Sequence, residues 1–181
     1  MSDLYLIGLG NPGEQYQYNR HNVGFIFLDY VQKQLRSSDF SLLKKEWPLL
    51  ASTGNLGEHK IILVKPLTFM NKSGDAISVL KNYYKIAVEQ FLVVFDDKDM
   101  EFPKLRYREE GSSGGHNGVK SLISVLGLNF ARYKIGVADS HKLAYQDTAD
   151  FVLSNFSSEE RRILQEKIFP ELWTQILEKF T

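Results

Sequence analysis

The sequence predicts an α/β fold: a single domain over residues 1–181 that forms a three-layer sandwich, with a mixed, mostly parallel central sheet flanked by helices. Short apolar runs alternate with segments of helical periodicity, which is the pattern of strands joined by crossover helices. Residues 91–95 are apolar without interruption, as expected for a strand covered on both faces. Two further runs are joined through the glycine-containing residues 54–57, which indicates a hairpin and therefore a mixed sheet.

Local signals place the ends of these elements. Gly8 ends the first apolar run, and Pro66 closes a later one because proline lacks a backbone donor. Ser73 can cap one helix, and Gly127 can end another. The predicted elements are a strand at 4–7, a helix from about 22 to 35, strands at 47–53 and 60–64, a helix from 73 to 84, strands at 91–95 and 104–108, a helix from 116 to 126 and a strand at 132–137.

The C-terminal segment predicts a packing helix. Residues 157–160 contain a capping box, and apolar side chains follow at i+4 spacing. Pro170 lies inside this pattern. Because proline removes a backbone donor and crowds the preceding turn, we expect a kink or a break there.

The composition excludes several classes of function. There is no cysteine, which rules out disulfides, thiolate metal sites and a cysteine nucleophile. Lys plus Arg and Asp plus Glu number 22 each, so an RNA partner needs a local basic patch. No window is apolar and long enough to cross a bilayer, and the N-terminus does not resemble a secretory signal. We therefore expect a cytoplasmic protein with no membrane partner.

The chemistry is expected in residues 8–24, directly after the first predicted strand. Three glycines here satisfy G-x-G-x-x-G, the pattern of a dinucleotide site and hence of a nicotinamide-dependent oxidoreductase. That interpretation requires a helix at the third glycine and an acidic residue roughly 20 positions later at a strand end. A polar, tyrosine-rich loop follows instead, and Asp29 falls inside a helical pattern. The dinucleotide interpretation is therefore disfavoured.

His21 and Asp96 are the candidate catalytic pair. His21 comes just before a predicted helix, whose positive dipole end disfavours the imidazolium ion and would keep a general base neutral. Asp96 follows a central strand, at the edge where ligands of open α/β sheets bind, and can orient an imidazole. A lone histidine at a helix start is more often a structural hydrogen bonder, and residues 96–99 are also explained as a solvated turn or a site for a hard cation. A metal is disfavoured because no complementary acidic cluster stands nearby.

Other polar segments offer binding groups, each with a simpler explanation. Asparagines 11, 71 and 117 suit a peptide-like group, or serve as turns and caps. Residues 111–115 are expected to form either a mobile rim of the site or a plain linker. Basic residues near this segment are either a phosphate-binding rim or a solvated face. They are Lys104, Arg106, Arg108, Lys120, Arg132 and Lys134.

Taken together, these motifs resemble the bacterial-type peptidyl-tRNA hydrolases over residues 4 to about 153. The motifs are Gly8-Leu9-Gly10-Asn11-Pro12-Gly13, Tyr16, Arg20-His21-Asn22-Val23-Gly24, Thr68-Phe69-Met70-Asn71-Lys72-Ser73-Gly74, Asp96-Asp97-Lys98-Asp99 and Gly114-Gly115-His116-Asn117-Gly118. The resemblance implies a cofactor-free enzyme that binds the 3′ CCA end and acceptor stem of peptidyl-tRNA, and we take a monomer without an obligate protein partner as the default. The enzyme would hydrolyse the ester between peptide and tRNA and so recycle the tRNA.

The resemblance also implies roles by position. His21 matches the catalytic base, Asp96 its orienting carboxylate, and Asn11 the residue that helps distinguish blocked from free aminoacyl ends. The other matches face the substrate: Asn71 and Asn117 hold it, Tyr16 and Phe69 line its 3′ end, His116 lies in a mobile gate, and Arg108 and Lys134 form a phosphate clamp.

The sequence departs from the family pattern at two places. Both departures bear on the role of the region after Gly136 rather than on the chemistry. Asp97 stands where glutamate is common, and residues 137–141 lack the usual glycine-proline turn. We expect this region to contact the acceptor stem or to cover the groove. A non-catalytic RNA-binding module of the same fold remains an alternative, since chloroplast relatives of the family aid intron splicing.

Overall fold

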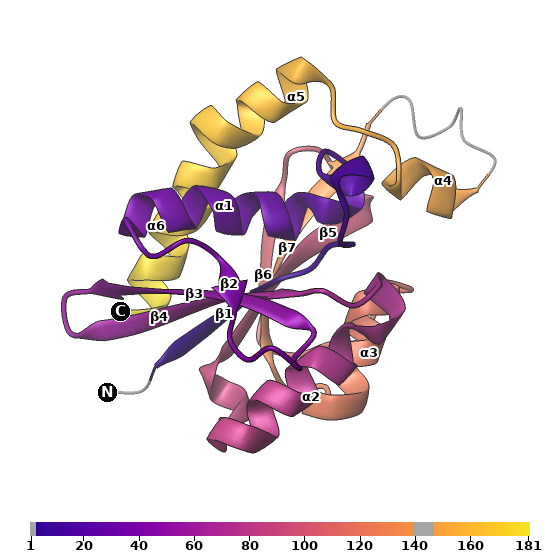
Figure 1. The fold of residues 1–181 in the computed structure, drawn as a ribbon. Helices are drawn as coiled ribbons and strands as arrows, with labels where there is room; N and C mark the ends of the chain where they lie inside the picture. Colours follow the sequence, from indigo (N-terminus) through magenta and orange to yellow (C-terminus); the bar gives the residue numbers. More distant parts are fainter. Residues whose placement is uncertain (1–2, 140–146) are drawn as a thin grey trace.

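The computed structural model describes residues 3–139 and 147–181, which form one seven-stranded sheet with helices on both faces (Figure 1). The strands follow the order β2-β3-β4-β1-β5-β7-β6. Their bounds are β1 Leu4–Gly8, β2 Ser41–Leu42, β3 Leu49–Leu56, β4 His59–Pro66, β5 Phe91–Glu101, β6 Leu105–Arg108 and β7 Ala131–Ala138. The α-helices are α1 Val23–Leu35, α2 Ser73–Tyr84, α3 Asn117–Leu126, α4 Thr148–Val152, α5 Ser158–Ile163 and α6 Phe169–Phe180.

The centre of the sheet is parallel and its outer strands are antiparallel. Strands β4, β1, β5 and β7 run in the same direction, whereas β2, β3 and β6 pair antiparallel with their neighbours. The predicted hairpin of β3 and β4 is present, with Leu56 paired to His59 at its turn. The prediction of a mixed sheet in an α/β fold is confirmed.

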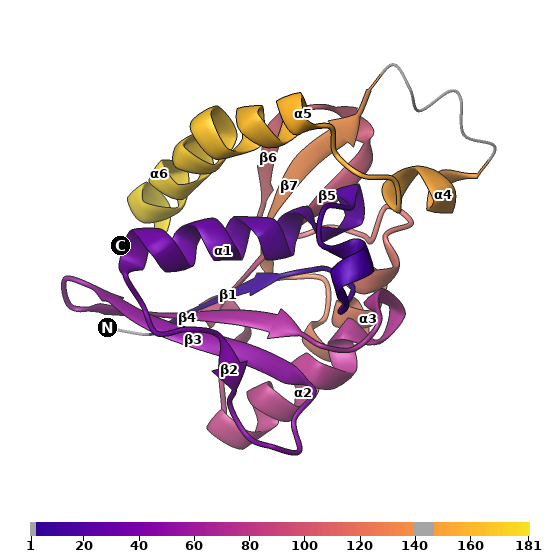
Figure 2. The same cartoon turned by 45° about the horizontal axis from the view of Figure 1, so that its top comes forward.

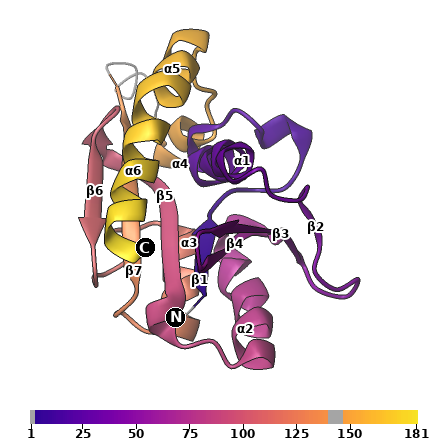
Figure 3. The ribbon, with the colours of Figure 1, turned by 90° about the vertical axis from the view of Figure 1, so that its left-hand side faces the viewer.

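Each face of the sheet is covered by its own helices. Leu4 and Leu6 of β1 belong to the apolar core beneath α1 and α6, and Tyr5 and Ile7 belong to the core beneath α2 and α3. This alternation is the period of two that a strand imposes. In Figure 3, α5 and α6 run along β6 and β7, away from α2. The three predicted layers are therefore present. No described helix has the length and apolarity needed to cross a membrane.

Two glycines let α1 start close against the sheet. A Cβ atom on Gly24 would lie 2.4 Å from the carbonyl oxygen of Val94, and one on Gly8 would lie 2.4 Å from the carbonyl oxygen of Gly24. Only glycine fits such close backbone approaches. The short 3₁₀ turn Arg20–Asn22 directly precedes α1, so this packing places His21 over the ends of β1 and β5.

Several elements differ from the sequence prediction. Strand β5 continues six residues beyond the apolar run that ends at residue 95, because β7 still pairs with it across a register shift between Asp97 and Glu101. Strand β2 and helix α4 were not predicted, because both are short and β2 is exposed. After Gly13 a 3₁₀ turn follows, Glu14–Tyr16, rather than the helix that a dinucleotide site requires.

The break expected at Pro170 takes the form of a π-helical segment. The segment Leu164–Ile168 separates α5 from α6, and Pro170 lies in the first turn of α6, where its missing N–H costs little. Upstream, the departure from the family pattern at 137–141 can be followed only to Asp139, since residues 140–146 lie outside the described part.

Candidate active site

A cavity of about 400 Å³ opens where the parallel strands end. Asn11 reaches it from the loop after β1, Phe69 and Asn71 from the loop after β4, Asp96 from β5, and His116 from the start of α3. The carboxyl ends of parallel strands are the usual ligand site of such sheets. Loops far apart in the sequence therefore contribute to one site.

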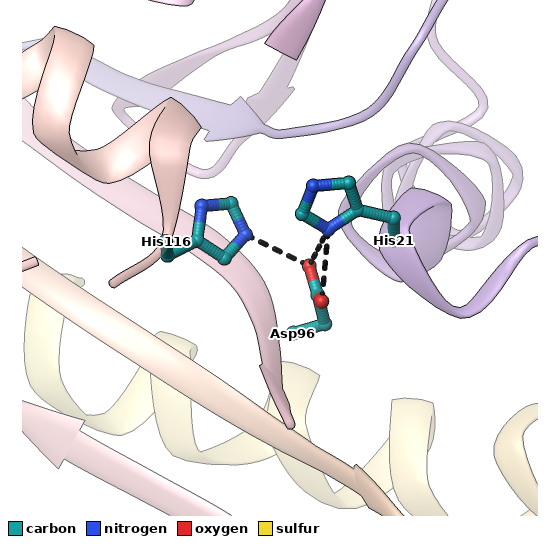
Figure 4. Close-up of side chains that lie close together, drawn as sticks. All are labelled: His21, Asp96 and His116. Carbon is teal, nitrogen blue, oxygen red and sulfur yellow. Dashed lines mark hydrogen bonds and ion pairs between the residues drawn. The ribbon is translucent and has the colours of Figure 1, made fainter. Parts of the chain in front are cut away.

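Three ionisable side chains meet at the wall of this cavity (Figure 4). The Nδ1 atom of His21 lies 2.9 Å from both carboxylate oxygens of Asp96, and the Nε2 atom of His116 lies 2.9 Å from Oδ1. Asp96 is 2% exposed, and the two imidazole rings lie 4.7 Å apart. One buried carboxylate therefore serves two histidines.

The surrounding hydrogen bonds fix the tautomers of both rings. The backbone N–H of Val119 donates to Nδ1 of His116 at 3.3 Å, so the ring proton of His116 is on Nε2 and points at Asp96. His21 likewise donates its Nδ1 proton to Asp96. The second nitrogen of His21, Nε2, points away from the carboxylate in Figure 4 and is left as a proton acceptor.

Burial and charge act against each other on this pair. Burial alone would raise the pKa of Asp96, but the charges and hydrogen bonds of His21 and His116 outweigh it and hold the pKa well below its usual range. Burial lowers the pKa of His21, but the Asp96 carboxylate raises it by more. The predicted effect of the helix N-terminus is to disfavour the imidazolium ion, whereas the nearby Asp96 carboxylate acts in the opposite direction and raises the pKa of His21.

Asn11 is held so that its amide offers a donor. The backbone N–H of Met70 donates to Oδ1 of Asn11 at 2.8 Å, which fixes the amide orientation and leaves Nδ2 for a ligand. Asn22 then exchanges two 2.9 Å hydrogen bonds with the backbone of Asn11. Sequence reasoning missed this role of Asn22, for which its place beside His21 was the available signal.

Most of the predicted site residues line the cavity, and two do not. Those that line it are Asn11, His21, Phe69, Asn71, Asp96, His116, Asn117 and Lys134. Tyr16 lies outside the lining, half-buried in its 3₁₀ turn. Arg108 is exposed on β6, outside the lining, and is paired in register with Arg132 rather than with Lys134.

Arg132 is not part of a phosphate rim. Its side chain is fully buried and donates to the carbonyl oxygens of Gly111, Ser112 and Leu128 at 2.8 to 3.3 Å. It therefore holds the start of the glycine-rich segment, whose residues Ser113 and Gly114 line the cavity. Lys134 does line the cavity, with its Nζ atom 3.7 Å from Asp97.

Helix α4 forms a wall that the sequence did not predict. Thr148, Ala149, Val152 and Leu153 line the cavity, so part of the region after Gly136 covers the groove, as expected. The signal for this helix was Asp147, whose carboxylate caps it by accepting from the N–H of Ala149.

His21, Asp96 and His116 are also the group that offers metal ligands among the described residues, with donor atoms within 4.8 Å of one another. Zinc bonds to imidazole nitrogen at about 2.0–2.1 Å, so a cation here would have to replace the existing hydrogen bonds and draw the side chains together. The 2.9 Å spacings are those of hydrogen bonds. As it stands, the group is arranged for proton transfer.

Comparison with known proteins assigns the family. A family model described as peptidyl-tRNA hydrolase matches residues 5–179. The chain belongs to the peptidyl-tRNA hydrolase family. The chain is 44% identical to the peptidyl-tRNA hydrolase of Rickettsia bellii, over 91% of this chain and 87% of that protein. It is 42% identical to that of a Thermoanaerobacter species, with the same coverage. The crystal structure of peptidyl-tRNA hydrolase from Acinetobacter baumannii matches with a TM-score of 0.78 at 27% identity, covering 96% of this chain and 94% of that one.

The family assignment confirms the resemblance that the motifs predicted. It also makes the chain a hydrolase of translation and disfavours the non-catalytic RNA-binding module. The roles of individual residues stay predictions, and they are argued below from the geometry.

Proposed function

We propose that this chain hydrolyses the ester between the peptide and the 3′ ribose of tRNA, with His21 as the general base. The observation that carries this proposal is the His21–Asp96 pair at the cavity wall, joined by two 2.9 Å contacts from one ring nitrogen. That contact leaves His21 Nε2 as an acceptor, which is what activation of a water molecule requires.

The reaction needs one proton to move twice. His21 Nε2 takes a proton from water as the water oxygen attacks the ester carbonyl carbon, and Asp96 stabilises the imidazolium that forms. The tetrahedral intermediate then collapses, the bond to the 3′ oxygen breaks, and His21 returns the proton to that oxygen. The products are a tRNA with a free 3′ hydroxyl and a peptide carboxylic acid, which releases its remaining proton to solvent and becomes the carboxylate. We assign stabilisation of the oxyanion to the amide of Asn71, which lies at the cavity.

The orientation of Asn11 explains why aminoacyl-tRNA with a free amino group would not be cleaved. Because Met70 occupies Oδ1 of Asn11, the group that Asn11 offers is the Nδ2 donor. A blocked amino group carries an acyl carbonyl that accepts from this donor, whereas a free ammonium group carries only donors and is repelled. A site built around a hydrogen bond rejects a ligand that cannot make it.

The same proposal places the tRNA at the rim of the cavity. Phe69 is 61% exposed there and suits stacking of a 3′-terminal base. Lys134 and Lys98 line the same cavity and suit phosphates near the CCA end. Tyr16 and Arg108 lie outside the lining, so we assign them at most to contacts farther along the acceptor stem. We take the chain to act as a monomer in the cytoplasm.

The test compares two substrates. Purified chain should cleave N-acetyl-aminoacyl-tRNA and leave unblocked aminoacyl-tRNA intact, with and without a chelator. His21→Ala should abolish cleavage and keep tRNA affinity, while Arg162→Gln, on the exposed face of α5, is the matched control that should keep both. Near-normal turnover by His21→Ala would contradict the assignment of the base. Binding of tRNA without cleavage by the wild-type chain would favour the RNA-binding alternative.

A further inference from the structure

Arg20, the residue directly before His21, is buried among partners from the C-terminal region. Its Nε atom donates to Oγ of Ser154 at 3.2 Å, Nη1 to Glu160 at 2.9 Å, and Nη2 to Asp139 at 2.8 Å. Its side chain is 6% exposed. The guanidinium group also lies over the rings of Phe151 and Phe156, at 5.1 and 5.2 Å from their centres. The donors of the Arg20 guanidinium group thus connect three separate segments of the chain.

The backbone reinforces the same junction. The N–H of Arg20 donates to the carbonyl oxygen of Ser154 at 3.0 Å, and the N–H of Phe156 donates to that of Tyr18 at 2.9 Å. Asn19 donates from Nδ2 to Asn155 at 2.7 Å. Residues 18–20 and 154–156 therefore run side by side, and Figures 1 and 2 show the loop before α1 next to the segment between α4 and α5.

This junction stands between the proposed base and a wall of the cavity. His21 follows Arg20 on one side of it, and Val152 and Leu153, which line the cavity, precede Ser154 on the other. Phe151, under the guanidinium group, is a fully buried residue of α4. A shift of the Arg20 guanidinium group relative to its partners would move His21 and the α4 wall apart.

We propose that Arg20 is a positioning residue: it ties His21 to α4 and so sets both the alignment of the base and the width of the groove that receives the acyl chain of the substrate. The inference rests on the proposed function of the cavity. The positioning role requires arginine in particular. A lysine would keep the charge, but it has no planar guanidinium group with which to reach three partners. A misplacement of about 1 Å at a base can cost about 100-fold in rate.

The experiment measures kcat and KM of Arg20→Lys on N-acetyl-aminoacyl-tRNAs with a small and a bulky side chain, as a function of pH. Arg162→Gln is the control, since Arg162 pairs with Glu159 and Glu166 on the exposed side of the same region. We expect kcat of Arg20→Lys to fall about 10- to 100-fold, the preference between the two acyl groups to change, and the acid limb of the pH profile to move to lower pH as His21 loses alignment with Asp96. A loss of kcat explained by the unfolded fraction alone would overturn the proposal.

A second variant and a second readout separate this proposal from the proposed function. Asp139→Asn keeps Arg20, Ser154 and Glu160, so it serves even where Arg20→Lys fails to fold. The proton NMR signal of the His21 Nδ1 hydrogen should shift in both variants and stay in place in Arg162→Gln, with no substrate present. An unshifted signal in a folded variant overturns the role of Arg20. Failure of the wild-type chain to cleave its substrate overturns the proposed function instead.

Discussion

The side chain of Asp96 contacts both histidines of the site. Its carboxylate accepts from two imidazoles, and its burial means that any change to it is felt by both. The sequence placed Asp96 at a strand end and His21 before a helix, which was sufficient to predict the pair. It could not show that His116 shares the carboxylate, because that contact depends on the turn that places His116 as the cap of α3.

Asp96→Asn should lower kcat about 10²- to 10⁴-fold. The new amide can donate to Nδ1 of His21, which selects the tautomer with the proton on Nε2, and that nitrogen then cannot take a proton from water. Single-turnover kinetics on N-acetyl-aminoacyl-tRNA measure the effect. Asp97→Asn is the matched control, because Asp97 contacts Lys134 rather than His21 and should leave kcat near the wild-type value. Equal losses in the two variants would contradict the role of Asp96.

The pH profile should report the upward shift in the pKa of His21. His21 acts as a base only when neutral, so kcat/KM should rise with pH through the pKa of His21 in the free enzyme. Because Asp96 raises that pKa, the acid limb should lie above the ordinary histidine value of about 6.5. In Asp96→Asn the residual activity should show a limb at lower pH. An acid limb at or below the ordinary value in the wild-type chain would contradict this assignment.

The spacing of apolar residues predicted the helices and strands of the core. It did not predict the polar segments that form part of the site. The run at 91–95 identified β5, but the strand continues through Asp96 and Asp97 because β7 supplies the pairing, which no local pattern reveals. Helix α4 was missed because it is five residues long and its apolar side chains cover a groove rather than follow a long helical period. Arg132 was misassigned because its burial depends on carbonyl groups from distant loops.

The start of α1 is the element on which the site depends most. Gly24→Ala should destabilise the fold by about 1–3 kcal/mol, because the new methyl group would meet the backbone of Val94 and Leu9 at 2.4–2.5 Å. The displacement of α1 should also carry His21 away from Asp96 and lower kcat. Urea unfolding and turnover measure the two effects.

The control for Gly24→Ala is Gly57→Ala, in the turn between β3 and β4. Gly57 has a φ of +59° and open space where a Cβ atom would lie. That substitution should cost only the backbone strain of a left-handed residue, about 1–2 kcal/mol, and leave kcat unchanged. A Gly24→Ala variant with normal turnover would show that the close approach does not position His21.

For the whole molecule, the absence of net charge limits how tRNA can be bound. Basic and acidic residues balance at 22 each, so no overall field draws in the nucleic acid. Binding must then come from a few cations near the cavity, of which Lys134 and Lys98 line it. The affinity for tRNA should therefore depend on salt through a small number of released counterions.

Lys134→Gln should weaken tRNA binding and reduce the slope of log Kd against log salt by about one unit. One phosphate contact would be lost, and Asp97, 3.7 Å from Lys134 in the wild-type chain, would be left facing the phosphate without its cation. Lys60→Gln is the matched control, since Lys60 is exposed at the start of β4, whose other end leads to the cavity. Filter binding from low to moderate salt measures both slopes. An unchanged slope for Lys134→Gln would mean that other cations contact the phosphate. Lys98 would then be the next candidate, because it lines the same cavity.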